Sequence, residues 1–452
     1  MTAEKRNHML LNEPVHKVIP RLAVPSIISM LISAIYNMAD TFFVSQIGTS
    51  ASAAVGVTFS IMTIVQAIAF TIGMGSGTNV SQALGAGDET RARRFVSTGV
   101  ITAFCTGIVI ALLGLSCIEP LVYFLGATPT IAPYAIDYAT YIFYGTPFIM
   151  ASFAMNNVLR FEGLSMYGMI GITTGGIMNM ILDPILIFGL GLGTAGAAIA
   201  TAISQAVSFF ILLLMCNTRP DAIAVRLHDF KPGAAIYSRI LYNGIPSLGR
   251  QGIASVSNIL LNTAAGPYGD AAIAAMSIVG RFVMFINSSV IGFGQGFQPV
   301  CGFCYGAGAY KRVREAFRFS VKIATCILLA LGLCAMLLSS NIIAIFRRDD
   351  LEVIRIGTLA LRLQLCTIPL WGFIVMSNMF TQSIGYGMRA TLISISRQGL
   401  FLIPSLLILP HIIGLLGIQI AQPLSDVLSF AFAAFIVGGI LRQLRGMEDR
   451  SK

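Results

Sequence analysis

The stretch GMGSGTNVSQALGAG, residues 73–87, recurs 221 positions later as GQGFQPVCGFCYGAG, residues 294–308, with four of its glycines in register. Further pairs at the same offset are Pro25-Ser26 with Pro246-Ser247, Arg91 with Arg312, and Arg93 with Arg314. The chain therefore consists of two copies of one unit of roughly 220 residues. In a membrane protein such a duplication is typical of a transporter whose substrate path lies between the halves.

The composition indicates a membrane protein. Hydrophobic residues make up 56% of the chain, charged residues 11%, and the mean hydropathy is +0.82. A soluble domain carries about 25% charged residues. Long apolar runs must form helices in lipid, since their amides find no water there. We therefore expect an all-α polytopic membrane protein with twelve transmembrane helices, at about residues 18–45, 52–80, 92–116, 132–158, 166–189, 193–217, 238–264, 273–303, 315–340, 353–384, 390–412 and 415–441.

The net charge of +10 is distributed asymmetrically over the ends of these spans. One set of ends carries 21 lysines and arginines, whereas the opposite set carries only Arg347, Arg348 and Arg355. By the positive-inside rule, both termini are cytoplasmic in a multi-pass protein of the bacterial cytoplasmic membrane. The basic loops set the topology and can touch anionic lipid. Nucleic acid is not an expected partner, because no basic stretch forms a recognition module.

An even number of spans in each copy gives both copies the same orientation. The expected architecture is two six-helix bundles related by a pseudo-twofold axis along the membrane normal. The long polar stretch at about 217–237 joins them, with Pro220 and Pro232 indicating loop. We place the N-terminal lobe at residues 1–225 and the C-terminal lobe at 226–452.

Two carboxylates inside the predicted spans stand out, Asp40 and Asp183. An aspartate in the bilayer costs roughly 2.5–3.5 kcal/mol on the insertion scale, so its retention requires a reason. Asp40 lies eight residues before Gly48, Asp183 eight before Gly191, and Thr201 eight after Gly193. At 1.5 Å per residue, all three lie about 12 Å below the outer boundary.

Further polar residues lie near this depth. Asn179 shares a helix face with Asp183, and Tyr36 and Asn37 lie about one turn below Asp40. Carboxylate, amide and hydroxyl oxygens suit a hard cation, and paired carboxylates can also share a proton. Na⁺ or H⁺ is therefore the expected coupling ion, with Na⁺ at Asp40, Asn179, Asp183 and Thr201 and no other cofactor. The alternative is that each acid pairs with a buried donor for structural reasons.

Prolines indicate bending points. Pro25 leaves the carbonyl of Arg21 without its helical donor, and Pro246 repeats this arrangement in the second copy. Pro184 follows Asp183 directly. We expect Pro25 to act as a hinge; a passive kink is the alternative.

The second half has different chemistry. Leu261 stands where Asp40 stands, and Ile403-Pro404 resembles Asp183-Pro184 with the charge removed. The C-terminal lobe instead carries Arg250-Gln251 and Arg397-Gln398 within its spans. A buried arginine needs a partner, and structural pairing or contact with substrate or lipid both remain open.

These residues resemble the multidrug and toxic compound extrusion (MATE) family over nearly the whole chain. The segments that carry the resemblance are 36–48, 85–93, 179–189, 269–281 and 294–302. The resemblance implies two six-helix bundles around a central cleft, and export of amphipathic, mostly cationic drugs or metabolites by antiport with Na⁺ or H⁺ through alternating access. It places the ion site on Asp40, Asn179, Asp183 and Thr201, with Tyr36, Asn156 and Tyr138 as neighbours.

One branch of the family adds a glutamate in the seventh helix, where this chain has Gly252-Ile-Ala-Ser255. The chain therefore resembles the bacterial branch that couples through the N-terminal lobe (DinF- and MepA-like).

We expect a monomer that is a transporter and not an enzyme. A flippase for a lipid-linked anionic precursor is the alternative, and would depend on Arg250, Arg281 and Arg397. A membrane-embedded transferase is disfavoured, because such enzymes usually need an aspartate-rich metal motif and Asp349-Asp350 is the only pair of adjacent aspartates.

Overall fold

The computed structural model describes residues 3–346 and 350–451, and the elements within these ranges are all helical. Arg347 and Arg348 of the charge count, and Asp349 of the acidic doublet, lie outside the described residues. The elements are α1 (Ala3–Asn12), α2 (Val15–Ser45), α3 (Thr49–Gly85), α4 (Glu89–Ser116), α5 (Ile118–Phe124), α6 (Ala132–Phe161), α7 (Ser165–Pro184), η1 (Ile185–Gly189), α8 (Gly193–Thr218), η2 (Leu227–Asp229), α9 (Ala234–Ala265), η3 (Gly266–Tyr268), α10 (Asp270–Gly306), α11 (Tyr310–Leu337), α12 (Ser339–Phe346), α13 (Leu351–Ser383), α14 (Gly387–Ile395), η4 (Ser396–Leu402), α15 (Ile403–Ile413) and α16 (Leu415–Ser451).

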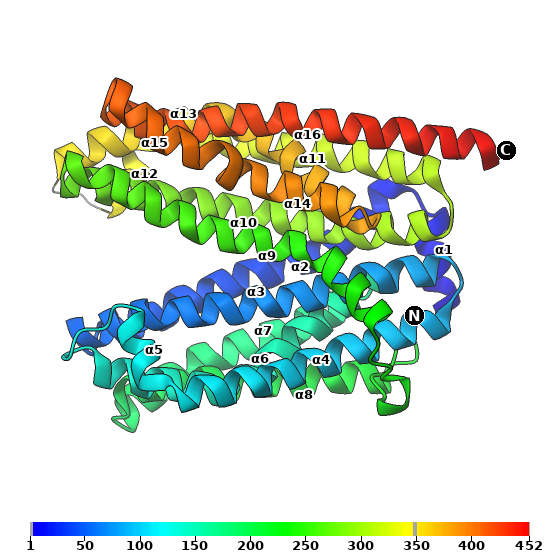
Figure 1. Ribbon diagram of the computed structural model, residues 1–452, viewed down its shortest axis with the longest axis horizontal. Helices are drawn as coiled ribbons and strands as arrows, with labels where there is room; N and C mark the ends of the chain where they lie inside the picture. Colours follow the sequence, from blue (N-terminus) through cyan, green and yellow to red (C-terminus); the bar gives the residue numbers. More distant parts are fainter. Residues whose placement is uncertain (1–2, 347–349, 452) are drawn as a thin grey trace.

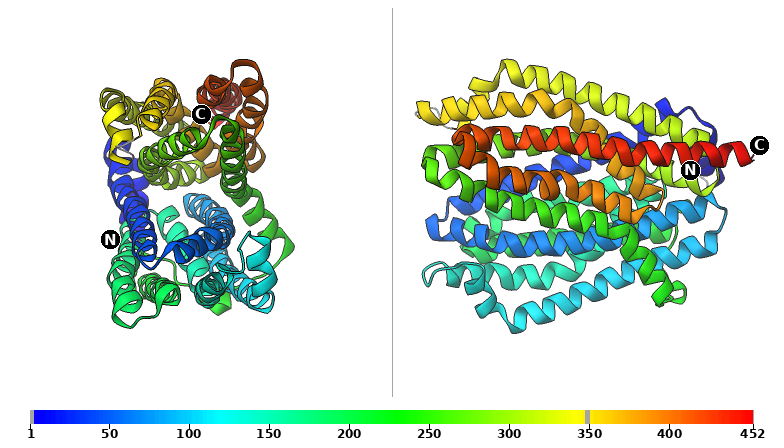
Figure 2. Two further views of the ribbon diagram at one scale, coloured as in Figure 1. Left: turned by 90° about the vertical axis from the view of Figure 1, so that its left-hand side faces the viewer. Right: turned by 45° about the horizontal axis from the view of Figure 1, so that its top comes forward.

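The helices form two bundles that lie one above the other (Figure 1) and appear as two separate groups when viewed from the end (Figure 2). One bundle contains α2 to α8 and the other contains α9 to α16. The connection between α8 and α9 includes η2, and the proposed lobe boundary at 225/226 falls within it. Helix α1 and the end of α16 lie at the same end of the molecule, which we call the terminal end; the opposite end is the distal end.

The prediction of an all-α polytopic membrane protein is confirmed. Within the described residues, ten helical segments are long and apolar enough to cross a membrane. Helices α6 and α9, with 30 and 32 residues, complete the twelve expected spans, although they do not meet the same hydropathy criterion. Several helices are longer than predicted: α3 begins at Thr49 and ends at Gly85, where the prediction was 52–80. The short helices α1, α5 and α12 were not predicted.

The two lobes pack backbone against backbone toward the terminal end. A Cβ added at Gly85 would lie 2.0 Å from the carbonyl oxygen of Phe303, and one added at Gly306 would lie 2.1 Å from that of Gln82. Gly85 and Gly306 are equivalent positions of the duplication, 221 residues apart. Glycine is required at both, since any side chain would separate the helices.

Hydrogen bonds cross the same interface. Ser81 Oγ donates to the carbonyl of Pro299 at 3.1 Å, and Gln82 Nε2 donates to that of Ser383 at 2.8 Å. These bonds join α3 of one lobe to α10 and α13 of the other. The closely packed end of the structure is therefore the terminal end.

The distal halves of α2, α9 and α10 expose large apolar side chains. Met38 of α2 is 67% exposed, Ile259 of α9 is 65% exposed and Met284 of α10 is 69% exposed. No hydrogen bond in the described chain joins the lobes at this level.

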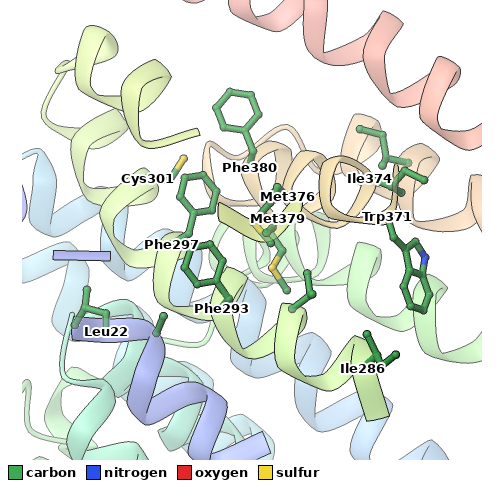
Figure 3. Close-up of a cluster of buried hydrophobic side chains, with 14 of the residues drawn as sticks. Leu22, Ile286, Phe293, Phe297, Cys301, Trp371, Ile374, Met376, Met379 and Phe380 are labelled. Atoms are coloured by element: carbon green, nitrogen blue, oxygen red, sulfur yellow. The ribbon is translucent and has the colours of Figure 1, made fainter. Parts of the chain in front are cut away.

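The core of the C-terminal lobe is built from aromatic and sulfur-containing side chains. Figure 3 shows Phe293 and Phe297 of α10 beside Met376 and Met379 of α13, all of them buried. Leu22 of α2 lies at the edge of this cluster, so that the core continues into the other lobe. Methionine fills such irregular spaces well because its side chain is unbranched.

Candidate functional site

Four helices of the N-terminal lobe bring a polar cluster together. Asn179 of α7 donates from Nδ2 to Asp183 Oδ1 at 3.2 Å and lies 3.3 Å from Thr201 Oγ1 of α8. The side chains of Asn179, Asp183 and Thr201 are all buried. These three residues and Asp40 are those for which the sequence predicted an ion site, and we call them the N-lobe acid cluster.

Helix geometry explains why these residues meet. Asn179 and Asp183 are one turn apart in α7, and a π-helix, η1, begins directly after Pro184. Gly191 and Gly193 then adopt left-handed backbone conformations, with φ of 66° and 56°. This turn, which favours glycine, sends α8 back alongside α7. Thr201 therefore returns to the level of Asn179.

Asp40 joins the cluster through α6. The hydroxyl of Tyr138 donates to Asp40 Oδ2 at 3.3 Å, and Tyr138 is almost fully buried. The carboxylates of Asp40 and Asp183 lie close enough to repel one another, and Tyr138 interacts with both. The two acids thus form one electrostatic unit, although they come from different helices.

The cluster contains more oxygen acceptors than donors. Asp40 Oδ1, Asp183 Oδ2 and Asn179 Oδ1 are buried and have no hydrogen-bond partner in the described chain. Buried polar atoms are normally paired, so three unpartnered oxygens in one cluster need an explanation. Hard oxygen ligands of this kind suit Na⁺, and a proton on either carboxyl group would relieve the same deficit.

Two of the predicted neighbours of the cluster, Tyr36 and Asn37, lie on α2. Tyr36 of α2 is buried and packs against Gly176 of α7. Asn37 Nδ2 donates to the carbonyl of Ser33 at 2.7 Å.

Asn156 is not brought into hydrogen-bond contact with the acids. A Cβ added at Gly168 of α7 would lie 2.7 Å from Asn156 Nδ2. At 1.5 Å per residue, Gly168 is about 16 Å along the helix from Asn179. Asn156 therefore belongs to the terminal half of the lobe.

Sequence reasoning missed two polar residues of α8, Ser204 and Gln205. Both are buried, and Ser204 Oγ and Gln205 Oε1 have no hydrogen-bond partner among the described residues. Both lie within about one turn of Thr201, a spacing that could have indicated them.

The C-terminal lobe contains a carboxylate that the sequence analysis did not single out, Asp426 of α16. Arg397 Nε donates to Asp426 Oδ1 at 2.6 Å, and Thr367 Oγ1 donates to Asp426 Oδ2 at 3.0 Å. The guanidinium of Arg397 also lies 3.8 Å from the centre of the Trp371 ring. Of the alternatives left open for Arg397, the structure supports structural pairing.

The duplication could have indicated Asp426. Ser204-Gln205 and Ser425-Asp426 are 221 residues apart, so Asp426 occupies the position equivalent to Gln205. The positions equivalent to Asp40 and Asp183 are apolar in this lobe, so the comparison of those two positions alone gives no acid as a partner for Arg397.

The remaining polar residues of the C-terminal lobe differ in their contacts. The backbone carbonyl of Gln398 accepts from Ser257 Oγ at 2.7 Å, whereas its buried side-chain Oε1 has no hydrogen-bond partner within residues 3–346 and 350–451. The carbonyl of Gln251 accepts from Ser255 Oγ within α9. Arg250 makes no hydrogen bond and no ion pair in the described part of the chain.

Comparison with known proteins finds one family model and several relatives that match both halves of the chain. The family model MatE matches residues 25–185 and 246–407, one match in each half. The multidrug export protein MepA of Staphylococcus haemolyticus (strain JCSC1435) is 26% identical over 431 residues, covering 95% of each chain. MepA of Staphylococcus aureus (strain MSSA476) is 28% identical over 434 residues, covering 95% of this chain and 94% of that protein.

A solved structure is similar to this chain over nearly its whole length. It is described as the outward-facing conformation of a multidrug resistance MATE family transporter of the MOP superfamily. It superposes with a TM-score of 0.92 at 27% identity, covering 97% of this chain and 98% of the other. The similarity therefore extends over both lobes.

Proposed function

Because the chain belongs to the MatE family, we propose that it is a secondary active transporter that exports amphipathic, mostly cationic drugs or metabolites. Export is driven by antiport with Na⁺ or H⁺. The observation that carries this proposal is the N-lobe acid cluster, with its three unpartnered oxygens on Asp40, Asn179 and Asp183. The coupling ion is cargo, so its site must be able to empty during each cycle.

The acid cluster provides the coupling. When the site is empty, two carboxylates leave negative charge in the N-terminal lobe, which attracts a lipophilic cation. When Na⁺ or H⁺ binds there, that charge is neutralised and the attraction for the drug falls. Coupling of this kind is reciprocal, because a bound drug must weaken ion binding by the same factor.

The packing of the lobes indicates which state is described. The lobes meet at the terminal end through Gly85, Gly306 and the hydrogen bonds of Ser81 and Gln82. With both termini in the cytoplasm of a bacterial cell, as the distribution of basic residues predicts, this state opens outward. Alternating access then requires the terminal contacts to separate and the distal halves to approach.

The alternatives have less support. The flippase hypothesis depends on Arg250, Arg281 and Arg397, and the charge of Arg397 is compensated by Asp426. The relatives are described as multidrug export proteins, which also does not favour a flippase. Enzymatic activity has no support from the matched family, and we propose that the protein works as a monomer without a cofactor other than its coupling ion.

Gradient-driven transport tests the proposal directly. Purified protein is placed in liposomes loaded with a fluorescent lipophilic cation, and an inward Na⁺ gradient or pH gradient is imposed in separate runs. Faster dye efflux with one gradient than without any supports antiport and identifies the ion. Lipid scrambling without dye efflux would instead support a flippase. Dye efflux that is independent of both gradients would contradict ion coupling.

A further inference from the structure

Helix α8 extends the buried polar face of the acid cluster toward the terminal end. After Thr201, Ser204 and Ser208 follow at spacings of three and four residues, which places all three on one helix face. Each of them is at most 3% exposed. We call these three residues the α8 polar row. The row begins at the acid cluster, because Thr201 Oγ1 lies 3.3 Å from Asn179 Nδ2.

The two serine hydroxyls of the row are not used by the protein. Ser204 Oγ and Ser208 Oγ are buried and have no hydrogen-bond partner within the described residues. Other buried helical hydroxyls bond to the carbonyl four residues earlier, as Thr146 does at 2.9 Å. Buried polar groups that lack a protein partner commonly bind ordered water. Side chains one turn apart have Cβ atoms about 5–6 Å apart, a gap that one water molecule bridges between two hydroxyls.

Helix α7 covers the row through a glycine. A Cβ added at Gly175 would lie 3.0 Å from Ser208 Cβ and 3.6 Å from Ser208 Oγ. The Ser208 hydroxyl therefore lies in the interface between α7 and α8, inside the lobe and away from lipid.

Leu212 ends the row. It is the next residue on the same face of α8, and it is fully buried. A Cβ added at Gly171 of α7 would lie 2.4 Å from Leu212 Cγ, so the isobutyl group fills the interface between the two helices. This apolar layer offers a proton no hydrogen bond, and a charge does not cross it unless Leu212 moves.

A polar cavity of about 300 Å³ lies beyond Leu212, and we call it the terminal cavity. Cys216, one turn further along α8, lines it, as do Asp221 and Arg93. The Arg93 side chain is 52% exposed, so the cavity reaches solvent at the terminal end. Ser208 and Cys216 are eight residues apart, about 12 Å along the helix, and Leu212 lies midway between them.

We propose that the α8 polar row conducts protons from the N-lobe acid cluster toward the terminal cavity, and that Leu212 closes this route. Each hydroxyl or bridging water gives up its own proton as it receives another, so only protons move along the row. Na⁺ would need several oxygen ligands at each step, which single hydroxyls do not supply.

The route lies inside one lobe and is separate from the space between the lobes. The inference rests on the proposed function, because a proton that drives export has to leave the acid cluster on the cytoplasmic side. With Leu212 in place, as in this structure, the gradient does not dissipate through the lobe. Movement of Leu212 during the transport cycle then releases the proton.

The first experiment measures proton flux without any drug. Full-length protein is placed in liposomes that contain the pH-sensitive dye pyranine, the external pH is lowered, and valinomycin with potassium clamps the membrane potential. In Leu212→Ser we expect proton entry to rise at least about tenfold over the wild type, a barrier lower by about 1.4 kcal/mol. Leu214→Ser is the matched control, because Leu214 lies in the same helix and is 59% exposed, and it should leave the flux unchanged.

The double variant Leu212→Ser with Ser208→Ala should return the proton flux to the wild-type level, because it interrupts the row. Flux that stays high in the double variant would overturn the role of the row. Absence of any increase in a folded Leu212→Ser protein would overturn the closing role of Leu212. Sodium flux that rises in parallel, measured with a sodium-sensitive dye, would contradict a route for protons.

The second experiment tests the row without disturbing Leu212. In Ser208→Ala we expect export of a cationic dye driven by a pH gradient to fall about tenfold. Tm should not fall, because the lost hydroxyl has no protein partner. Thr146→Val is the control, since the hydroxyl of Thr146 is equally buried but bonds to its own helix, and export should be unchanged.

Unchanged pH-driven export in Ser208→Ala would overturn the proton route. Failure of the wild type to export dye under a pH gradient would instead contradict proton antiport in the proposed function. The proton flux of Leu212→Ser, which needs no drug, then decides the route by itself.

Discussion

Gly75 of α3 lies directly against Ile240 of α9, and a Cβ added at Gly75 would stand 1.9 Å from the Ile240 carbonyl oxygen. The contact has a close counterpart one turn away, where a Cβ at Gly244 would lie 2.1 Å from the carbonyl of Thr71. The neighbouring atoms are backbone, which cannot rotate aside. These contacts make closure of the terminal end sensitive to a single methyl group.

Gly75→Ala should therefore favour separation of the lobes at the terminal end. Overpacking of this kind costs about 1–3 kcal/mol, which increases the open population by about 5- to 150-fold. Amide hydrogen exchange over residues 71–85 and 237–244 should become faster by that factor. Gly56→Ala is the matched control, because it lies in the same helix with nothing within 4 Å of its added Cβ. Equal exchange in both variants would show that the contact does not control closure.

Asp183→Asn should abolish gradient-driven drug export at unchanged expression. The change removes one of two repelling carboxylates and with it the ionic ligand for Na⁺ or the site for H⁺. Efflux of a cationic dye from proteoliposomes measures the effect. Asp88→Asn is the matched control, since Asp88 caps α4 from an exposed position and asparagine caps equally well. Retained coupling in Asp183→Asn would remove this residue from the ion site.

The sequence predicted the fold and much of the site for physical reasons that can be named. Hydropathy and the repeat fixed the number of spans, and equal distances from Gly191 and Gly193 predicted that Asp183 and Thr201 lie at one depth. The structure brings Asn179 within hydrogen-bond distance of both. Asp40 was placed by the same depth argument, although its contact with Tyr138 was implied only by the family resemblance.

What the sequence could not supply were contacts between distant segments. The partner of Arg397 is Asp426, 29 residues later in another helix, and no local spacing indicates that pair. Asn156 was assigned to the acid network, yet it packs against Gly168 in the terminal half.

The pair formed by Arg397 and Asp426 predicts an unequal response to single and double substitutions. Asp426→Ala should lower the free energy of unfolding by about 3–5 kcal/mol, because it leaves a buried arginine without its acid. The double variant Arg397→Met with Asp426→Leu should be close to the wild type in stability. Thermal unfolding in detergent measures both. A double variant less stable than Asp426→Ala would show that the pair contributes more than charge compensation.

Pro25→Ala should slow transport more than it weakens drug binding. Helix α2 continues through Pro25, whose missing N–H leaves the carbonyl of Arg21 without its helical partner. Alanine restores that bond and stiffens the helix. Turnover should fall by about tenfold, a barrier increase of about 1.4 kcal/mol. Dye binding measured by fluorescence anisotropy should change by less than about twofold. An equal loss of binding and turnover would argue against a hinge.

Helix α1 should detach from the N-terminal lobe in Arg6→Ala. Arg6 is 2% exposed; its Nη1 donates to the carbonyl of Asp221 at 2.5 Å and lies 3.9 Å from Glu162 Oε2. Burial raises the pKa of Glu162 to about 7, and the charge of Arg6 opposes that rise. Without Arg6, the pKa of Glu162 should increase further, so that the carboxyl group is protonated at neutral pH.

Hydrogen exchange of residues 3–12 measures the detachment. The C-terminal lobe holds the other end of α1, since Arg312 Nε donates to the carbonyl of Leu10 at 2.9 Å. Exchange should therefore increase most around Arg6 and least around Leu10. Arg93→Ala is the control, because Arg93 forms an exposed pair with Glu89, and such pairs contribute little to stability. Unchanged exchange around residue 6 in Arg6→Ala would mean that the apolar contacts of Met9 and Leu10 hold α1 without the arginine, and that the two polar contacts of Arg6 are not what attaches α1 to the N-terminal lobe.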